Sequence, residues 1–199
     1  RFMRETSWRV EHEHVITPLG WVGEDDKVMF TMPLIRGGSL AQIIKEQGAL
    51  PPSWAVLVID QLLQALEAVH NRGLVHRDIK PDNIMVEENG SAKLVDYDLS
   101  GPAYEVMSLP TRIGTAAFLS PEANRGEPLG PENDLYGVGV LLGWGIHGQL
   151  PEVGEALPAT RDPLTPVWRS LTREDPRKRP NDAQQVKEEL LELALGTYL

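Results

Sequence analysis

The chain has 199 residues, enough for one domain with a sizeable buried core but few for an enzyme that needs two full lobes. Its net charge of -10 and its pI near 5.0 have the wrong sign for a surface that follows a nucleic-acid backbone, so we expect no nucleic-acid partner. The absence of cysteine excludes disulfides and any Cys-based metal site.

The sequence carries no signal for a membrane. No apolar run reaches the roughly 20 residues that a membrane span requires, and no signal peptide opens the sequence. We therefore expect a cytoplasmic protein without a membrane contact in these residues, although an anchor outside them is compatible with the sequence.

The first part of the chain predicts a helix followed by a β hairpin. Residues 1–12 contain good helix formers without Gly or Pro. Residues 15–34 change to two strand-like pieces, and the turn-prone stretch Gly-Glu-Asp-Asp at 23–26 separates them.

Two helices are predicted next. Ser39 is a suitable N-cap for a helix over 40–47, which Gly48 ends. A second helix then continues until Asn71 and Gly73. Its apolar side chains are expected along one buried stripe: Trp54, Leu57, Val58, Leu62, Leu66 and Val69.

The remaining pattern is mixed but mainly helical. Asn89 and Gly90 lie between two apolar pieces and predict a hairpin with a two-residue turn. The polar stretch 100–115 predicts a loop. The nearly all-apolar stretch 134–146 predicts a buried helix, and 181–196 predicts an amphipathic one. This order of elements predicts an α+β fold.

The segment from His76 to Asn83 reads His-Arg-Asp-Ile-Lys-Pro-Asp-Asn and follows the second helix. It resembles the catalytic loop H-R-D-x-x-x-x-N of the eukaryotic-type protein kinase family, bacterial members included. The resemblance implies that Asp78 accepts or orients the proton of a substrate hydroxyl. It also implies that Lys80 contacts the transferred phosphoryl group, as in Ser/Thr kinases, and that Asn83 holds a magnesium ion. A charged turn that solvates itself is the alternative, and eight consecutive matching positions disfavour it.

Asp96, Tyr97 and Asp98 stand where this family has D-F-G. The resemblance implies that Asp96 binds magnesium and that Tyr97 preserves the packing ring. Asp98 departs from the family, because Gly tolerates left-handed backbone angles more readily than Asp does. Neutral drift and an effect on loop switching both remain open for this position.

Residues 114–122 resemble the family segment that ends the activation loop with A-P-E. The resemblance implies that Thr115 bonds near the catalytic loop. It also implies that Glu122 pairs with Arg179, since a buried carboxylate needs such a partner. Asp134 matches the residue that accepts backbone hydrogen bonds from the catalytic loop.

Arg77 beside the catalytic aspartate indicates control by phosphorylation of the activation loop, because a phosphate there can pair with its guanidinium. Ser108 and Thr111 are the candidate acceptors. That they are ordinary loop hydroxyls is an equally open alternative.

Five residues are implied to line the ATP site. Glu5 resembles the glutamate that pairs with the ATP-binding lysine, with a solvated surface glutamate as the alternative. Met32, Pro33 and Ile35 resemble the hinge, in which Pro33 keeps its C=O and Ile35 its N-H for the two adenine bonds. Met85 would form the floor under adenine, or belong to the core.

The histidines show no metal-ligand spacing. His76 is expected to pack under Asp96. The others are expected to be surface or packing residues: His12, His14, His70 and His147.

The Gly-rich loop and the strand lysine of the family do not occur in this sequence. The resemblance therefore implies a truncated N-lobe over 1–35, made of one helix and a β hairpin up to the hinge, and a mainly helical C-lobe over 36–199.

The implied function is a protein Ser/Thr kinase that uses ATP and Mg²⁺, here as an N-terminally incomplete catalytic domain that is weak or inactive alone. Its partners would be a protein substrate with Ser or Thr and a missing N-lobe segment or partner chain. A non-catalytic kinase-like module is the alternative, and a small-molecule phosphotransferase on a related fold is disfavoured by the Ser/Thr-type loop.

Overall fold

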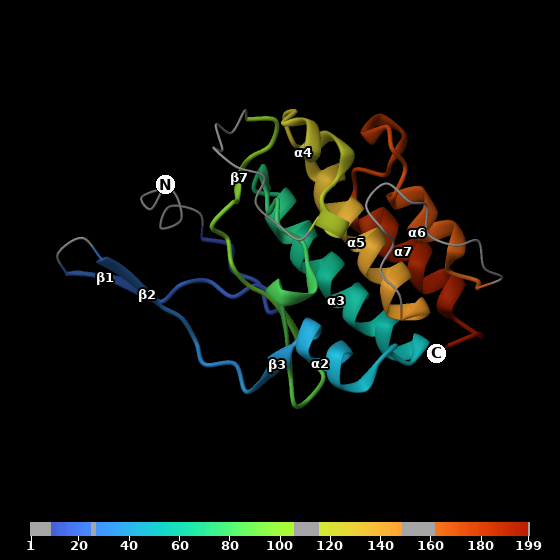
Figure 1. Ribbon diagram of the computed structural model, residues 1–199, viewed down its shortest axis with the longest axis horizontal. Helices are drawn as coiled ribbons and strands as arrows, with labels where there is room; N and C mark the ends of the chain where they lie inside the picture. Colours follow the sequence, from blue (N-terminus) through green and yellow to red (C-terminus); the bar gives the residue numbers. More distant parts are fainter. Residues whose placement is uncertain (1–8, 25–26, 106–115, 149–161, 199) are drawn as a thin grey trace.

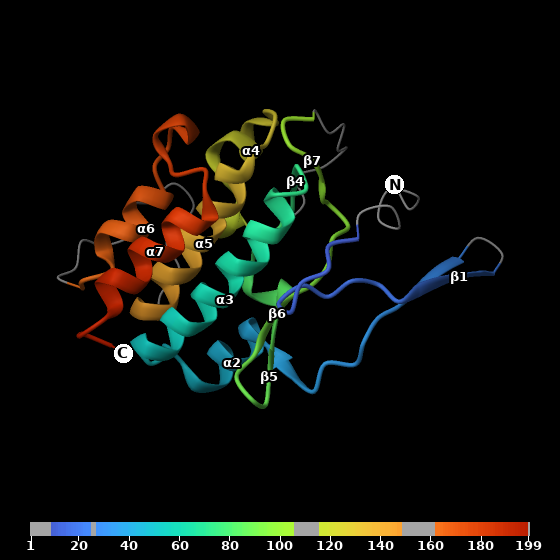
Figure 2. The same cartoon turned by 180° about the vertical axis from the view of Figure 1, so that it is seen from behind.

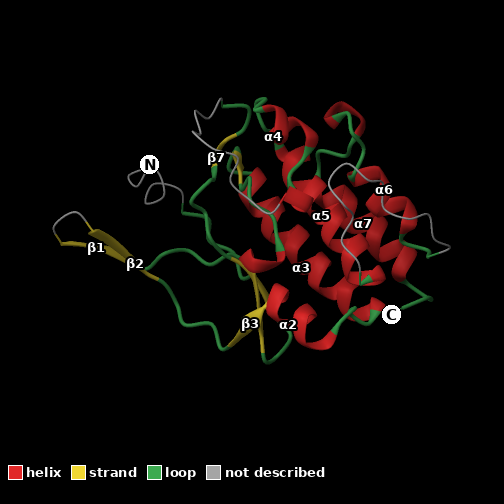
Figure 3. Cartoon of the chain, in the orientation of Figure 1, coloured by secondary structure: helices red, strands yellow, loops and turns green. Residues whose placement is uncertain are grey.

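The computed structural model describes residues 9–24, 27–105, 116–148 and 162–198. Figures 1 and 2 show a body of packed helices with small sheets along one side. The hairpin of β1 (Gly20–Glu24) and β2 (Lys27–Thr31) projects from that body, as the secondary-structure colours in Figure 3 make clear. The mainly helical α+β fold is therefore confirmed.

The helical body is built around α3, the 19-residue helix Pro52–His70. The other helices of this body are α5 (Pro131–His147), α6 (Thr165–Leu171) and α7 (Ala183–Ala194). Helix α3 contacts both α5 and α7, and α5 contacts α6. The core between them holds large side chains with almost no exposed surface: Leu62, Leu63, Leu66, Leu135, Leu142, Trp168, Leu171 and Leu190. Removing this apolar surface from water supplies the main driving force for the fold.

Two shorter helices flank the body. Helix α2 spans Leu40–Gln47, and its N-cap is Ser39, whose hydroxyl accepts a hydrogen bond from the Gln42 N-H. Gly48, with φ 81°, ends the helix as expected. Helix α4 spans Pro121–Arg125, and Ser120 caps it in the same way through the Ala123 N-H.

The strands form three small antiparallel sheets. The first pairs β1 (Gly20–Glu24) with β2 (Lys27–Thr31), which confirms the predicted hairpin. The second has the order β3-β5-β6, with bounds Gly37–Ser39, Ile84–Glu87 and Ala92–Leu94. The third pairs β4 (Leu74–Val75) with β7 (Gly101–Pro102), inside the stretch 100–115 that was predicted to be a loop. Short 3₁₀ turns cover Pro81–Asn83, Ala116–Phe118 and Pro176–Lys178.

The helix predicted over 1–12 is wrong where the structure describes it. Residues 9–12 have no helical structure, and residues 1–8 lie outside the described residues. The segment that follows, from His14 to Ile16, runs beside β6, because Ile16 N-H donates to the Leu94 carbonyl and Leu94 N-H donates to that of His14. These sheet-like bonds hold the backbone extended.

The hairpin between β5 and β6 has a three-residue loop, and the predicted two-residue turn is wrong. Val86 lies opposite Ala92, so residues 88–90 form the loop. Gly90 N-H donates to the Glu87 carbonyl, and Gly90 has φ 85°. A turn followed by one left-handed residue is the usual form of a three-residue hairpin loop.

The predicted apolar stripe of α3 includes one error. Leu57 is 45% exposed, whereas Val58, Leu62, Leu66 and Val69 are buried. Successive residues of an α-helix are about 100° apart around its axis. Leu57 is therefore turned away from the face on which Val58 lies.

Within the described residues, no helix is both long enough and apolar enough to cross a membrane.

Candidate active site

The predicted catalytic loop begins directly after β4, and a side chain of α5 binds its backbone. Asp134, at the start of α5, accepts the His76 N-H at Oδ2 and the Arg77 N-H at Oδ1, both at 2.8 Å. The expected role of Asp134 is thus confirmed. Arg77 has φ 71°, a left-handed angle that a side chain rarely adopts and that these two bonds help to hold.

His70 is a member of this anchor that the sequence interpretation missed. Its Nε2 lies 2.9 Å from Asp134 Oδ2, and both side chains are buried. Burial acts to raise the pKa of Asp134, but interactions with His70 and His76 together outweigh it and the pKa is lowered. The only signal in the sequence was the position of His70 in the last turn of α3, six residues before His76.

Asp78 is bound on one oxygen by two side chains. Lys80 Nζ lies 2.7 Å from Asp78 Oδ2, and Asn83 Nδ2 donates to the same oxygen at 2.9 Å. Asn83 Nδ2 also donates to the Asp78 carbonyl at 2.9 Å. Within the described part of the chain, Asp78 Oδ1 has no donor. The carboxylate therefore keeps one oxygen for a further proton donor.

The Asp96–Asp98 segment packs on the catalytic loop through His76. The His76 and Tyr97 rings meet edge to face with centroids 4.7 Å apart, and His76 Nε2 lies 3.1 Å from the Val95 carbonyl. His76 was expected to pack under Asp96, and in the structure its ring contacts the next residue, Tyr97. Burial raises the pKa of the Tyr97 phenol, so its hydroxyl is neutral at physiological pH.

The left-handed residue of this segment is Asp96, with φ 64°. Asp98 is not among the described residues with positive φ, so the conformational freedom of Gly is not needed there. Instead, the Asp98 N-H donates to Asp96 Oδ1 at 3.3 Å. The supposed backbone penalty of Asp98 is therefore absent from this conformation.

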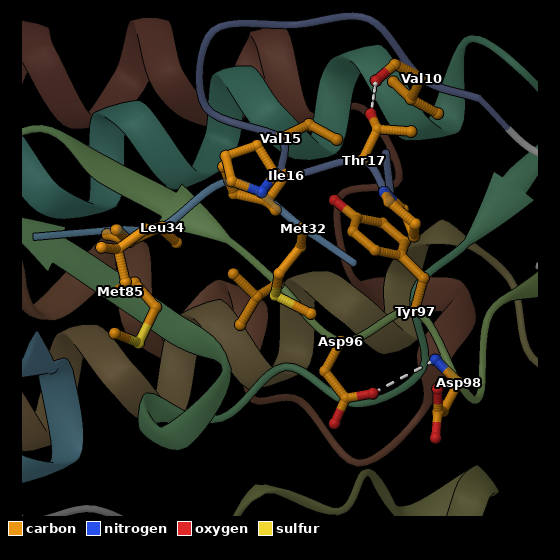
Figure 4. A pocket seen from close by; sticks show the side chains of 14 residues that line it. Val10, Val15, Ile16, Thr17, Met32, Leu34, Met85, Asp96, Tyr97 and Asp98 are labelled. Atoms are coloured by element: carbon orange, nitrogen blue, oxygen red, sulfur yellow. Dashed lines mark hydrogen bonds between the residues drawn. The ribbon is translucent and has the colours of Figure 1, made fainter. Parts of the chain in front are cut away.

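A cavity of about 560 Å³ opens beside this segment. Its wall brings together the hinge residues, Met85 and the Asp96–Asp98 segment (Figure 4). The wall is mostly apolar and has these residues: Val10, Val15, Ile16, Thr17, Pro18, Met32, Pro33, Leu34, Ile35, Met85, Val95, Asp96, Tyr97 and Asp98. Size and apolar character match a site for a small planar ligand.

The four residues predicted for phosphoryl transfer fall into two groups. Asp78, Lys80 and Asn83 form one hydrogen-bonded cluster, whereas Asp96 lies in the cavity wall. The two groups are joined through the backbone, because the Val95 N-H donates to the Asn83 carbonyl at 3.0 Å. Two other predicted residues, Glu5 and Thr115, lie outside the described residues, as do Ser108 and Thr111.

Asn83 and Asp96 offer the oxygen atoms that a magnesium ion prefers. Asn83 uses its Nδ2 to hold Asp78, which leaves its Oδ1 without a donor in the described part of the chain. Asp96 Oδ2 is likewise without one there. Side-chain amide and carboxylate oxygens are suitable Mg²⁺ ligands. The residues therefore fit the implied metal.

The Arg77 side chain spans the start of the activation segment. Its Nη2 donates to the Pro102 carbonyl at 2.6 Å and to that of Glu105 at 3.4 Å. A Cβ at Gly101 would lie 2.8 Å from Arg77 Nη1, so the absence of a side chain at Gly101 allows this close approach. Arg77 thus fixes β7, from which the chain continues towards Ser108 and Thr111.

The predicted pair of Glu122 and Arg179 is confirmed. Arg179 donates through Nη1 and Nη2 to the two Glu122 oxygens at 2.6 and 2.8 Å, and both side chains are buried. The guanidinium also lies 4.8 Å from the centre of the Tyr136 ring. This bidentate pair ties α4 to the segment before α7.

Comparison with known protein families agrees with this geometry. The family model described as "Protein kinase domain" matches residues 2–193. The chain belongs to the protein kinase family. The match covers the helical body, the hinge and the loop with Asp78. The resemblance seen in short motifs therefore extends over almost the whole of this chain.

Several of the relatives are bacterial proteins that are named Ser/Thr kinases. The Serine/threonine-protein kinase PknL of Mycobacterium tuberculosis is 40% identical over 137 residues, which are 67% of this chain and 34% of that protein. The Serine/threonine-protein kinases drp72 of Corynebacterium efficiens is 32% identical over 193 residues, 94% of this chain and 36% of that protein. The Probable serine/threonine-protein kinase PknB of Corynebacterium glutamicum is 33% identical over 167 residues, 78% of this chain and 26% of that protein. The chain thus spans about a third of the length of the relatives that it matches first.

Proposed function

We propose that this chain is the larger part of a catalytic domain that transfers the γ-phosphoryl group of ATP to Ser or Thr hydroxyls of proteins. The observation that carries the proposal is the Asp78 carboxylate, held by Lys80 and Asn83 on a loop that Asp134 fixes from beneath. The family match and the names of the bacterial relatives support the same assignment.

In this proposal Asp78 orients the substrate hydroxyl and accepts its proton. Lys80 Nζ bonds Asp78 Oδ2, so Oδ1 is left to face the hydroxyl. The Lys80 ammonium would also offset negative charge on the transferred group, which spreads over three oxygens in the transition state. Asn83 donates one hydrogen bond to the Asp78 carboxylate and one to the Asp78 backbone carbonyl, which places a base, a cation and an amide on one short rigid loop.

We propose Asn83 and Asp96 as the residues that hold Mg²⁺. A bound Mg²⁺ would neutralise charge on the phosphates of the nucleotide. The cavity would take the adenine between the hinge, with the Pro33 carbonyl and the Ile35 N-H, and Met85. The apolar wall supports this placement, because a planar aromatic ring gains most from a dry, apolar slot.

We further propose that residues 1–35 are a partial N-lobe, that 36–199 are the C-lobe, and that an N-lobe segment or a partner chain covers the cavity on its hinge side. The support is exposed apolar surface there, since Met32 is 51% exposed and Leu34 87%. Dependence on ATP supports a cytoplasmic location.

The test is a kinase assay on the longest natural form of the protein with ATP, Mg²⁺ and a Ser/Thr protein substrate. Asp78→Asn and Asp96→Asn should each lower kcat/KM on the order of a hundredfold or more, because each removes a positioned group. Glu188→Gln, on the exposed face of α7, serves as the matched loss of one carboxylate and should not change the rate.

Two outcomes would contradict the proposal. Full activity in both aspartate variants would reject the assigned roles. No transfer by the natural protein, with a protein partner bound equally well by wild type and both variants, would favour a non-catalytic binding module instead.

A further inference from the structure

Asp98 stands in the wall of the nucleotide-sized cavity, next but one to Asp96. Its side chain is exposed. The bond from the Asp98 N-H to Asp96 Oδ1 closes a short turn between the two residues. Asp98 therefore adds a second carboxylate to the same part of the wall.

The cavity has two chemically different ends. In Figure 4 the side chains of Asp96 and Asp98 lie at one end, and those of Leu34 and Met85 lie at the other. An apolar end suits a planar ring, but an acidic end repels the phosphates that such a ring carries in a nucleotide. A cation between wall and phosphates would remove this conflict.

No protein cation balances the two carboxylates. Throughout the ranges that the structure describes, neither Asp96 nor Asp98 forms an ion pair with Lys, Arg or His. The nearest lysine by sequence, Lys93, donates from its Nζ to the Glu13 carbonyl at 2.7 Å and lies 3.8 Å from Glu87 Oε2. Lys80 has its Nζ 2.7 Å from Asp78 Oδ2. Within those ranges, the two carboxylates at the acidic end of the cavity thus have no paired cation.

The backbone shows that Asp98 is accommodated without strain. Only three described residues other than Gly have positive φ, namely Arg77, Asp96 and Tyr104. Asp98 therefore does not occupy the left-handed region that favours Gly.

We propose that Asp98 is a further carboxylate for the divalent cation of this site and raises the affinity of the protein for that cation. The inference rests on the proposed function in one respect, since it places the cation at Asn83 and Asp96. Asp98 contributes either a direct oxygen ligand or an oxygen that binds a water of the hydrated ion, and Mg²⁺ commonly retains such waters.

The experiment measures cation binding and requires no turnover. Mn²⁺ is titrated into the purified natural protein, with and without ADP, and free Mn²⁺ is followed by electron paramagnetic resonance. Asp98→Asn should weaken Mn²⁺ binding by about tenfold, the size typical of losing a group that supports a metal site. Asp98→Gly, which restores the family residue, should weaken it by a similar factor.

Two further variants make the result specific. Glu88→Gln removes one exposed carboxylate from the hairpin loop, outside this cavity, and should leave the Mn²⁺ affinity within about twofold because exposed charges are screened by salt. Asp96→Asn should weaken Mn²⁺ binding more than any change at Asp98.

The outcomes separate the inference from the proposed function. Unchanged Mn²⁺ affinity in Asp98→Asn and Asp98→Gly, alongside a loss in Asp96→Asn, would overturn the role of Asp98 alone. Tighter ADP binding by the Asp98 variants with no change for Mn²⁺ would also overturn it, because Asp98 would then merely repel phosphate. Unchanged Mn²⁺ affinity in Asp96→Asn would instead contradict the metal site of the proposed function.

Discussion

His76 connects three parts of the candidate site through its backbone and its buried ring. Its backbone N-H donates to Asp134 Oδ2, its ring Nε2 lies 3.1 Å from the Val95 carbonyl, and its ring Nδ1 accepts the Asp78 backbone N-H at 3.3 Å. Accepting at Nδ1 and donating at Nε2 requires the neutral ring with its proton on Nε2. The role of His76 is therefore to fix the backbone at Asp78 and at Val95 as an uncharged hydrogen-bonding unit.

The protonation state of His76 predicts a pH dependence of stability. Burial lowers the pKa of His76 from its model-peptide value of 6.5, although the charge of Asp134 opposes this. A depressed pKa means that the unfolded chain binds the proton more readily. The contribution of His76 is thus fully present above pH 6.5 and is lost as the pH falls below it.

We expect the wild type to lose about 1 kcal/mol of unfolding free energy through His76 between pH 7.5 and 5.5. His76→Gln keeps a donor and an acceptor but cannot be protonated. Urea denaturation at the two pH values should therefore show a smaller loss in this variant. An equal loss in both proteins would show that His76 does not carry the effect.

At the scale of single residues, the sequence predicted best where chemistry demands a fixed partner. A buried carboxylate such as Glu122 requires a cation, and Arg179 was the residue that supplied it. His70 was missed because an isolated histidine at the end of an amphipathic helix has no partner in the linear sequence. Only the fold brings Asp134, 64 residues later, to within 2.9 Å.

Among the elements, those defined by neighbouring residues were predicted more accurately than those that depend on pairing between strands. The helix after Ser39 was predicted with its correct bounds, because its N-cap and its terminal Gly48 are encoded within ten residues. The loop of the β5–β6 hairpin was not, because its length depends on which residues of two strands face each other. Residues 9–12 were misread for a similar reason, since β6 holds the chain that follows them.

The hairpin loop gives a test of this explanation at the scale of the element. Gly90 has φ 85°, and a Cβ added there would meet no atom within 4 Å. Any cost of Gly90→Ala must therefore come from the backbone, and a left-handed angle costs an L-residue about 1–2 kcal/mol. Thermal or urea unfolding should show that Gly90→Ala lowers the free energy of unfolding by this amount.

Asn89→Ala provides the control in the same loop. Asn89 is not among the described residues with positive φ, and its side chain makes one exposed bond, from the Ser91 N-H to Oδ1 at 2.8 Å. Asn89→Ala should therefore lower the free energy of unfolding by less than Gly90→Ala does. A two-residue turn with left-handed angles at both positions would make the two substitutions cost about the same.

For the whole molecule, the fold divides into a closed helical body and an open cavity. The core between α3, α5 and α7 is buried from water by packing among the described residues. The cavity differs, because hinge residues in its wall are largely exposed and Leu34 shows 87% of its surface. The family motifs predicted the body and the hinge, but they do not determine what covers the hinge side.

Because the cavity is open along the hinge, we expect the 199 residues alone to bind ATP weakly. A ligand pocket normally buries 70–90% or more of a small ligand, and a cavity open along the hinge cannot do so. Calorimetric titration of this chain with ATP and Mg²⁺ should give a dissociation constant well above the micromolar range.

The longest natural form of the protein provides the comparison. If an N-lobe segment covers Met32 and Leu34, that form should bind ATP at least about tenfold more tightly, because each tenfold gain needs only about 1.4 kcal/mol of added contact. The same form should protect the backbone amide of Leu34 from hydrogen exchange. Micromolar affinity of the 199-residue chain would instead show that the hinge, Met85 and the acidic end of the cavity suffice to bind the nucleotide.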